Sequence, residues 1–528
     1  MSLLSRVLAR RAALAALFVC AACATQPPQH YIVAAAHPLA AEAGVKVLER
    51  GGSAVDAAIA VQMVLGLVEP ESSGIGGGAF MLHWSDHEKK LRAYDGRETA
   101  PAAARPDRFI KDGKPMAFLD AAVGGRSVGV PGALRMLEIA HQRHGRLPWQ
   151  ELFDPAIRIA EEGFDAPPKL REALARERFL KSDILSRPRI VNREYAETLR
   201  VIARGGASAF YDGDIARDMV VAVRTHPNPG DLSEEDLRNY RAVEREAVCG
   251  PYRSWRVCSM GPPSSGGVAV LQILGYLERT DFARAPAQSA AALHFFAEAA
   301  KLAYADRARY LGDPDFVPVP VRELLSSSYL DTRAKLITDR AMQLAPPGDP
   351  EAGTSHFSIA DARGDVVSMT TTIEAVFGSR VMVRGFLLNN QLTDFDFLPS
   401  QANSVAAGKR PRSSMAPTVV FERGQVRMAL GSPGGSMIIN YVAKALVGTL
   451  DWGLDIQSAI ELPNFGSRNG PTLIEQASRY EKLAPDLAQL GHQVEQIPLM
   501  SGLHGIERVA GGWRGGADSR RDGVARGR

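Results

Sequence analysis

Apolar and polar residues alternate along the chain just after residue 354, which is the pattern of half-buried strands. We predict strands at 357–360, 366–372, 386–390, 418–421 and 426–430. Between about 115 and 345 the apolar positions recur with helical spacing instead, and helices are expected at 268–277, 289–310 and, further on, 437–450. The order of helices, then strands, then helices favours one mixed α+β domain over a string of separate domains.

Near the start of the chain, a predicted strand at 31–36 precedes a helix at 38–50 and a second helix that begins after Ser53. Ser53 and Asp56 have the spacing of a capping box, in which each side chain accepts a hydrogen bond from the backbone of the other. The glycine-rich segment 74–79 then lies between a helix and a strand, the reverse of the order in a dinucleotide-binding fingerprint. We therefore expect these glycines to allow close backbone packing.

The stretch around Thr354 carries the candidate chemistry. A polar, proline-rich run over 346–350 leads into Gly353, and the predicted strand starts just beyond Thr354. If the bond between Gly353 and Thr354 is cleaved, Thr354 becomes a chain terminus whose α-amino group has a reference pKa of about 7.7 to 8. One residue then supplies both a hydroxyl nucleophile and the amine that activates it. Taken alone, the stretch also fits a solvated loop that enters a strand.

Composition and cysteine usage narrow the choices. The 528 residues have a formal net charge of +3, which gives no reason to expect nucleic acid as a partner. No group of cysteines and histidines has the spacing of a metal site, and we predict neither a metal nor a cofactor. Cys249 and Cys258 flank a predicted hairpin turn and would lie opposite each other, so that a cross-strand disulfide and two buried thiols both fit the pattern.

The first residues indicate a targeting segment. Three arginines precede an apolar run over 12–22 that is too short to span a bilayer. We predict a signal peptide over 1–22 and a tether over 23–30, and hence an exported protein that is periplasmic or secreted. The sequence Ala-Ala-Cys at 21–23 also fits a lipoprotein in which the lipidated Cys23 is the first residue, and the lipid would then be the one link to a membrane.

In their order and spacing, several motifs resemble those of the γ-glutamyltransferase (γ-glutamyltranspeptidase, glutathione hydrolase) family of N-terminal-nucleophile hydrolases. The segments that carry the likeness are 51–80, 95–98, 262–267, 303–307, 312–316, 354–358, 388–391, 409–415, 431–435 and 516–522. The resemblance implies a four-layer αββα sandwich and a precursor that cleaves itself between Gly353 and Thr354. A large subunit over 31–353 and a small subunit over 354–528 would then stay together as a heterodimer that forms one intertwined catalytic domain.

The resemblance also implies roles for single residues. Thr354 would be the nucleophile that forms a γ-glutamyl ester, Thr372 the hydroxyl that activates it, and Gly434 and Gly435 the oxyanion hole. The residues matching the positions that bind the α-carboxylate of the donor are Arg97, Ser413 and Ser414, and those around its α-ammonium are Glu374, Gln391 and Asp394.

Two departures from the better-known members bear on specificity. Glu374 stands where many members have Asn, which resembles a Bacillus-like branch and adds a negative charge beside the ammonium site. Only residues 395–408 join Asp394 to Lys409, which leaves no room for the lid loop that covers the pocket in other members. We therefore expect an open pocket that admits larger γ-glutamyl donors, including polyglutamate ends.

The expected reaction is cleavage of the γ-glutamyl amide bond of glutathione and related compounds, with transfer of the γ-glutamyl group to water or to an amino acid or dipeptide acceptor. One alternative is a cephalosporin or glutaryl acylase on the same fold, whose donor lacks the α-ammonium that Glu374 and Asp394 would bind. The other is a catalytically silent exported binding protein, against which the intact nucleophile and oxyanion residues argue.

Overall fold

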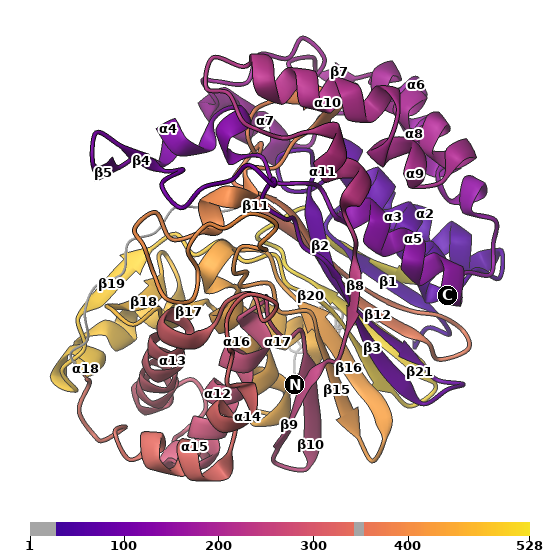
Figure 1. Ribbon diagram of the computed structural model, residues 1–528. Helices are drawn as coiled ribbons and strands as arrows, with labels where there is room; N and C mark the ends of the chain where they lie inside the picture. The colour runs from indigo at the N-terminus through magenta and orange to yellow at the C-terminus, as the bar shows by residue number, and fades with distance from the viewer. Residues whose placement is uncertain (1–27, 343–352) are drawn as a thin grey trace, which may run out of the picture.

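The computed structural model describes residues 28–342 and 353–528 (Figure 1). The predicted signal peptide over 1–22 and the candidate lipidation site Cys23 lie outside the described residues. Within the part that is described, no helix is long and apolar enough to cross a membrane.

The end of the predicted tether is attached to the body of the protein. Gln29 and Trp513 form an antiparallel β-bridge, with a backbone hydrogen bond of 2.8 Å in each direction. Backbone pairing therefore holds the chain against a C-terminal strand before the predicted large subunit begins.

Two antiparallel sheets stacked face to face form the centre of the molecule (Figure 1). The seven-stranded sheet has the order β22 (Val524–Gly527), β1 (Ile32–Ala35), β11 (Gly353–Ala360), β12 (Val366–Glu374), β2 (Gly78–Ser85), β3 (Lys90–Gly96) and β8 (Val243–Arg245). The six-stranded sheet has the order β21 (Gly512–Ala517), β20 (His504–Val509), β16 (Gln425–Gly431), β15 (Thr418–Glu422), β10 (Trp255–Ser259) and β9 (Val248–Tyr252).

Helices cover the outer face of each sheet. Those packed on the seven-stranded sheet are α2 (Pro38–Glu49), α3 (Ala54–Val68) and α5 (Ala133–His144), and those packed on the six-stranded sheet are α12 (Gly266–Glu278), α16 (Ile438–Leu450) and α17 (Ile456–Glu461). Helix α13 (Ala290–Tyr310) packs on α12. The four layers confirm the predicted αββα sandwich, and each helix layer buries an apolar core against its sheet.

Shorter elements complete the chain. The helices are α4 (Phe118–Ala122), α6 (Asp154–Glu162), α7 (Pro168–Arg176), α8 (Arg193–Gly205), α9 (Ser208–Tyr211), α10 (Asp214–Thr225), α11 (Glu234–Asn239), α14 (Val321–Leu324), α15 (Ser327–Ala334) and α18 (Ala484–Gln489). The strands are β4 (Ile110–Lys111), β5 (Lys114–Pro115), β6 (Phe164–Asp165), β7 (Arg189–Ile190), β13 (Met382–Val383), β14 (Phe386–Leu387), β17 (Phe465–Ser467), β18 (Thr472–Glu475) and β19 (Val494–Ile497). Most of these helices lie above the seven-stranded sheet, in the upper part of Figure 1.

Both sheets contain strands from either side of residue 354. In the seven-stranded sheet, β11 and β12 lie between β1 and β2, which come from the first part of the chain. In the six-stranded sheet, β15 from the second part pairs with β10 from the first. A cut before residue 354 would therefore leave two fragments joined by continuous strand pairing.

Strand β11 presents opposite chemistry on its two faces, as the period of two in a strand requires. Phe357 and Ile359 belong to the apolar core between the seven-stranded sheet and the helices that cover it. On the other face, the His356 ring bonds the hydroxyls of Thr370 at 2.8 Å and Ser358 at 3.1 Å. Polar side chains therefore occupy the space between the two sheets next to Thr354.

Several local expectations are confirmed. Both hydrogen bonds of the capping box between Ser53 and Asp56 are present at the start of α3, and the long predicted helix over 289–310 is α13 with Ser289 as its N-cap. The structure also joins Cys249 to Cys258, directly opposite each other in the β9–β10 hairpin, by a disulfide.

Two other expectations are wrong. The predicted strand over 386–390 stops at Leu387, and beyond it the side-chain amide of Asn389 binds the carbonyl of Gly76 while that of Asn390 binds Glu374. The chain also ends in strands rather than helices, since β20, β21 and β22 follow α18. Because β20 and β21 contain glycines, they have too few apolar side chains for apolar and polar residues to alternate visibly in the sequence. These strands are recognised only from their backbone pairing.

Candidate active site

Thr354 is the second residue of β11 and lies opposite Thr372 of β12, with 3.3 Å between the two hydroxyl oxygens. Thr354 is buried, with 3% of its surface exposed. The backbone N–H of Glu374 donates to the Thr372 hydroxyl at 2.8 Å, so the oxygen of Thr372 is fixed and its own proton can be donated to Thr354. The structure therefore brings together the two hydroxyls that the sequence singled out.

The backbone is irregular at the predicted cleavage site. Thr354 pairs with Thr372, but Gly353 pairs with Glu374 instead of the adjacent residue 373. The strand register therefore shifts between Gly353 and Thr354. Glu374 has a φ of 80°, in the left-handed region that non-glycine residues rarely adopt. Bulges and strained residues of this kind concentrate at functional sites, where they re-aim a side chain or a peptide group.

Two side chains next to Thr354 were not among the predicted site residues, namely the partly exposed Arg521 and the buried Glu69. Arg521 donates from Nη1 to the carbonyl oxygen of Thr354 at 3.2 Å, and Ser355 donates its hydroxyl to Glu69 at 2.7 Å. Burial raises the pKa of Glu69, while the positive charge of Arg521 opposes that shift. Arg521 thus fixes the peptide group that follows the nucleophile.

The predicted oxyanion residues begin the short helix at Gly435–Met437, where backbone N–H groups have no partner within the helix. Gly434 and Gly435 have φ values of 128° and 55°. A Cβ on Gly434 would lie 2.5 Å from the ring of Tyr441, so only glycine fits there. This turn presents N–H groups of the kind that stabilise a developing oxyanion.

The glycine-rich segment before β2 packs closely against β12, as expected. A Cβ on Gly77 would lie 2.1 Å from the carbonyl oxygen of Thr372. The absence of a side chain at Gly77 therefore lets the backbone approach β12 where Thr372 is positioned.

Arg97 is fully buried and pairs with Asp394 at 2.5 Å. Its Nε also donates to the carbonyl of Pro411 at 3.1 Å, and Gln391 donates to the same Asp394 oxygen at 2.6 Å. The residues predicted to bind the carboxylate and the ammonium of a donor are therefore neighbours. They form a site of paired opposite charges, which matches the charges of an amino acid.

Glu374 differs from its expected state. Burial and the nearby carboxylate of Asp394 raise the pKa of Glu374 to about 8, although Asn390 donates a hydrogen bond to its carboxylate. The expected extra negative charge is therefore mostly absent at neutral pH, because ionising the buried Glu374 next to the carboxylate of Asp394 is costly. An ammonium group bound between them would favour the ionised form.

Ser413 and Ser414 lie in a loop held against the segment before α12. Ser265 donates both its N–H, at 2.8 Å, and its hydroxyl, at 2.6 Å, to the carbonyl of Ser413. The hydroxyl of Ser414 accepts from Nη2 of Arg307 at 2.9 Å. Arg307, on α13, is thus a further residue of this region, and the motif around it gave no role in the sequence.

The segment over 395–408 forms a short closed loop, as its length predicts. Asn403 donates to the carbonyl of Asp394 at 2.7 Å and accepts from the backbone of Arg412 at 2.9 Å. These bonds fold the loop back on itself. It contains neither helix nor strand.

One buried group in the described chain has the composition of a metal site, namely His294, Glu298 and His492. His294 donates from Nε2 to a carbonyl oxygen at 2.8 Å, and its Nδ1 lies 2.7 Å from Nε2 of His492. Glu298 pairs with Lys301 at 2.8 Å, and the two residues hold the backbone N–H and carbonyl of Met342. Because these side chains bind one another, we assign the group a structural role.

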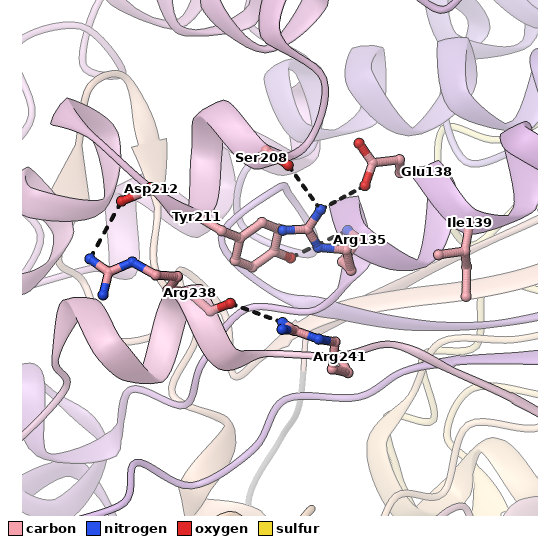
Figure 2. A pocket seen from close by; sticks show the side chains of 8 residues that line it. All are labelled: Arg135, Glu138, Ile139, Ser208, Tyr211, Asp212, Arg238 and Arg241. Carbon is pink, nitrogen blue, oxygen red and sulfur yellow. Dashed lines mark hydrogen bonds and ion pairs between the residues drawn. The ribbon is translucent and has the colours of Figure 1, made fainter.

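A cavity of about 420 Å³ lies behind the Arg97 segment (Figure 2). Its lining residues are Arg135, Glu138, Ile139, Ser208, Tyr211, Asp212, Arg238 and Arg241. Figure 2 shows the side chain of Arg135 beside that of Tyr211. The guanidinium carbon lies 4.6 Å from the centre of the tyrosine ring. Tyr211 stacks on Tyr240, whose hydroxyl donates to the carbonyl of Arg97 at 2.7 Å. The cavity therefore borders the support of Arg97, and no predicted site residue lines it.

An αββα sandwich that places a buried threonine at the start of a central strand, beside a second hydroxyl and a glycine turn, has the architecture of the N-terminal-nucleophile hydrolases. Within that class, the γ-glutamyltranspeptidase family model matches residues 40–527, and the chain belongs to this family of enzymes.

Three known proteins illustrate the similarity. The chain is 36% identical to the glutathione hydrolase proenzyme of Bacillus subtilis (strain 168), over 95% of this chain and 94% of that protein. It is 36% identical to the acylase ACY 1 proenzyme of Pseudomonas sp. (strain SE83), over 90% and 88% of the two chains. The crystal structure of cephalosporin acylase from Bacillus halodurans superimposes with a TM-score of 0.86 at 28% identity, covering 95% and 96%.

The first prediction concerns Thr372. We expect Thr372→Val to lower kcat about 100-fold, because the bond that orients and activates the Thr354 hydroxyl is lost. Thr371→Val is the matched control, since Thr371 is buried on the opposite face of the same strand, and its kcat should stay within about threefold of the wild type. Equal losses in the two variants would show that only strand packing had been disturbed.

The second prediction concerns Glu374. Its pKa of about 8 lies above its ordinary value of 4.5, so the carboxylate forms as the pH rises from 6 to 8 and attraction to an ammonium increases. We expect the inhibition constant of L-glutamate to fall severalfold over this range in the wild type and to stay constant in Glu374→Gln. Glutarate, which lacks the ammonium, is the control ligand. A parallel fall for glutarate would assign the effect to another group.

The same shift has a consequence for folding. Between pH 4.5 and 8 the unfolded chain loses the Glu374 proton before the folded chain does, so this residue makes the folded state less stable as the pH rises. The urea midpoint of Glu374→Gln should therefore fall less between pH 5 and pH 8 than that of the wild type. An identical fall in both proteins would contradict the assigned protonation.

Proposed function

We propose that the mature protein cleaves γ-glutamyl amides, such as glutathione, through an ester on Thr354. The observation that carries the proposal is the pairing of Arg97 with Asp394. A buried cation next to a partly exposed carboxylate suits a ligand that presents a carboxylate and an ammonium on one carbon, as the γ-glutamyl group does. A bound donor would exchange this internal ion pair for two ion pairs with the ligand.

The proposed reaction begins when the Thr354 hydroxyl attacks the carbonyl carbon of the γ-glutamyl amide. The proton of the hydroxyl passes to the α-amino group that cleavage of the precursor has exposed. The negative charge on the carbonyl oxygen is stabilised at the turn of Gly434 and Gly435. The tetrahedral intermediate then expels the leaving amine, which takes the proton from the α-amino group, and the γ-glutamyl ester remains.

In the second half of the reaction, water or the amino group of an amino acid or dipeptide attacks the ester. The α-amino group of Thr354 accepts the proton of the attacking group and returns it to the threonine oxygen as the ester bond breaks. Water yields glutamate, and an amine acceptor yields a new γ-glutamyl amide. The short loop over 395–408 supports access for larger donors such as polyglutamate ends.

The proposed maturation includes export and self-cleavage. The chain loses residues 1–22, with lipidation of Cys23 or plain secretion as the two routes, and reaches the periplasm or the exterior. It then cuts itself before Thr354 into fragments that remain a heterodimer, which the interleaved strands support.

The third prediction tests this maturation by the intact masses of protein purified from cells. The wild type should give two fragments that divide between Gly353 and Thr354, and Thr354→Ala should give one unbroken chain because the attacking hydroxyl is missing. The mass of the larger fragment also shows where the mature chain begins and whether Cys23 carries lipid. A division at any other bond would contradict the assignment of the nucleophile.

An acylase is the second candidate, because an acylase is among the most similar curated proteins and another among the most similar solved structures. The fourth prediction separates the two activities by comparing γ-glutamyl-4-nitroanilide with glutaryl-4-nitroanilide, which differ only in the α-amino group. We expect kcat/KM to be at least about 100-fold higher for the γ-glutamyl compound, since the glutaryl compound would draw Arg97 away from Asp394 without offering that carboxylate an ammonium. A preference for the glutaryl compound would establish the acylase.

A further inference from the structure

The cavity behind the Arg97 segment contains none of the proposed active-site residues, and three arginines are part of its wall. Its volume of about 420 Å³ is within the usual range for small-molecule sites. Arg135 belongs to α5, Arg238 belongs to α11, and Arg241 follows α11. Figure 2 shows Arg238 and Arg241 on one side and Arg135 on the other. The fold therefore brings three cations from separate segments to one cavity.

Two of these guanidinium groups are only partly used by protein contacts. Nη1 of Arg135 donates to Glu138 at 2.7 Å and to Ser208 at 3.4 Å, and no described residue accepts a hydrogen bond from its Nη2. Arg238 approaches Asp212 to 3.5 Å, and more than half of each of these two side chains is exposed. Both arginines therefore keep donors that a ligand can use.

Arg241 is a cation without a counter-ion in the described part of the chain. Its Nη1 donates to the carbonyl oxygens of Arg238 at 2.9 Å and Tyr240 at 2.8 Å, and no carboxylate of a described residue lies within 4 Å of its guanidinium. The cavity wall has two carboxylates, those of Glu138 and Asp212, against three guanidinium groups. The excess of positive charge favours an anion as the occupant.

The chemistry of the wall indicates the kind of anion. A guanidinium binds a carboxylate or a phosphate through two parallel hydrogen bonds. The Tyr211 ring is only 1% exposed, because Arg135 lies over it and Tyr240 stacks on it. Ile139 is the other apolar residue of the wall. With so little apolar surface available, the cavity suits a small polar oxyanion better than a hydrophobic ligand.

The wall of the cavity is connected to Arg97 by two routes. Tyr240 accepts from Arg241 at its carbonyl, and its hydroxyl donates to the carbonyl of Arg97 at 2.7 Å. The carbonyl of Arg241 accepts from Nη2 of Arg410 at 2.9 Å. Arg410 in turn lies 3.5 Å from Asp95, which accepts the backbone N–H of Arg97 at 2.8 Å. An anion that draws the Arg241 guanidinium away from Tyr240 would loosen the support of Arg97.

We propose that this cavity is a second binding site, which takes a small oxyanion with several charges, such as a polycarboxylate or a phosphate, and whose occupancy weakens the binding of a donor at Arg97. The site itself is independent of the reaction, whereas its effect on the donor rests on the proposed function. Because coupling between two sites is reciprocal, a bound donor weakens the binding of the anion by the same factor.

The fifth prediction is tested by isothermal titration calorimetry with citrate and with inorganic phosphate, in separate titrations at constant ionic strength. We expect at least one of the two to bind saturably with a Kd of about 1 mM or lower. Arg241→Gln should weaken this binding at least about tenfold, by the usual size of a charge-assisted hydrogen bond. The probe that binds more tightly shows whether the site prefers carboxylates or phosphate.

The kinetic arm measures the KM of γ-glutamyl-4-nitroanilide with and without a saturating concentration of the tighter probe. We expect the probe to raise KM about fivefold in the wild type, within the usual range of coupling between sites. In Arg241→Gln the same concentration of probe should leave KM unchanged, because the guanidinium that the probe displaces from Tyr240 is missing.

Two further variants separate the cavity from other sites. Ser414→Ala alters the proposed donor site and should leave the affinity for the probe unchanged, as should Arg479→Gln, which alters an exposed arginine that contacts Gln288. Failure of both probes to bind, or equal affinity in the wild type and Arg241→Gln, would overturn the proposal. Binding that leaves the wild-type KM unchanged would overturn it too. Calorimetry needs no turnover, so a wild type that binds the probe but cleaves no γ-glutamyl donor refutes the proposed function alone.

Discussion

The pairing of β11 with β12 is the interaction on which the rest of the structure depends. It sets Thr354 opposite Thr372, and its register shift at Gly353 places the irregular backbone at the bond proposed to be cut. Because β1 and β2 from the first part of the chain flank this pair, backbone hydrogen bonds on both sides fix the position of Thr354. A new chain terminus formed there would stay in the centre of a sheet, with its position determined by strands on either side.

Burial of charge explains why the proposed donor site is built from pairs. Arg97 and Glu374 are buried, so that a lone charge on either is costly, and Asp394 is partly exposed beside them. Without a ligand, Arg97 and Asp394 neutralise each other and Glu374 keeps its proton. A ligand with both charges can replace these contacts with its own, whereas a ligand with the carboxylate alone leaves Asp394 without a cation. Selectivity for an amino-acid end therefore follows from electrostatics more than from the shape of the pocket.

From the sequence, the sandwich and the candidate residues at the ends of its central strands could be predicted. The order and spacing of the motifs identified the candidate residues, and the strand periodicity indicated on which face each one lies. The sequence could not assign roles to Arg307 and Arg521, since these depend on contacts between segments far apart in the chain. It also missed β20 to β22, whose glycines hide the alternation. The protonation state of Glu374 could not be predicted either, because its pKa depends on groups that only the fold brings next to it.

The shared scaffold does not by itself choose between hydrolysis, transfer and acylase activity, since a cephalosporin acylase superimposes over almost the whole chain. The side chains that contact the acyl part and the leaving group of the substrate must therefore determine which of these reactions takes place. Attack of an acceptor amine on the ester is the reverse of the step that expels the leaving amine, so both amines occupy the same place beside the oxyanion turn. Water competes with an acceptor amine for the same ester, so the balance between hydrolysis and transfer depends on how often an acceptor fills this place first.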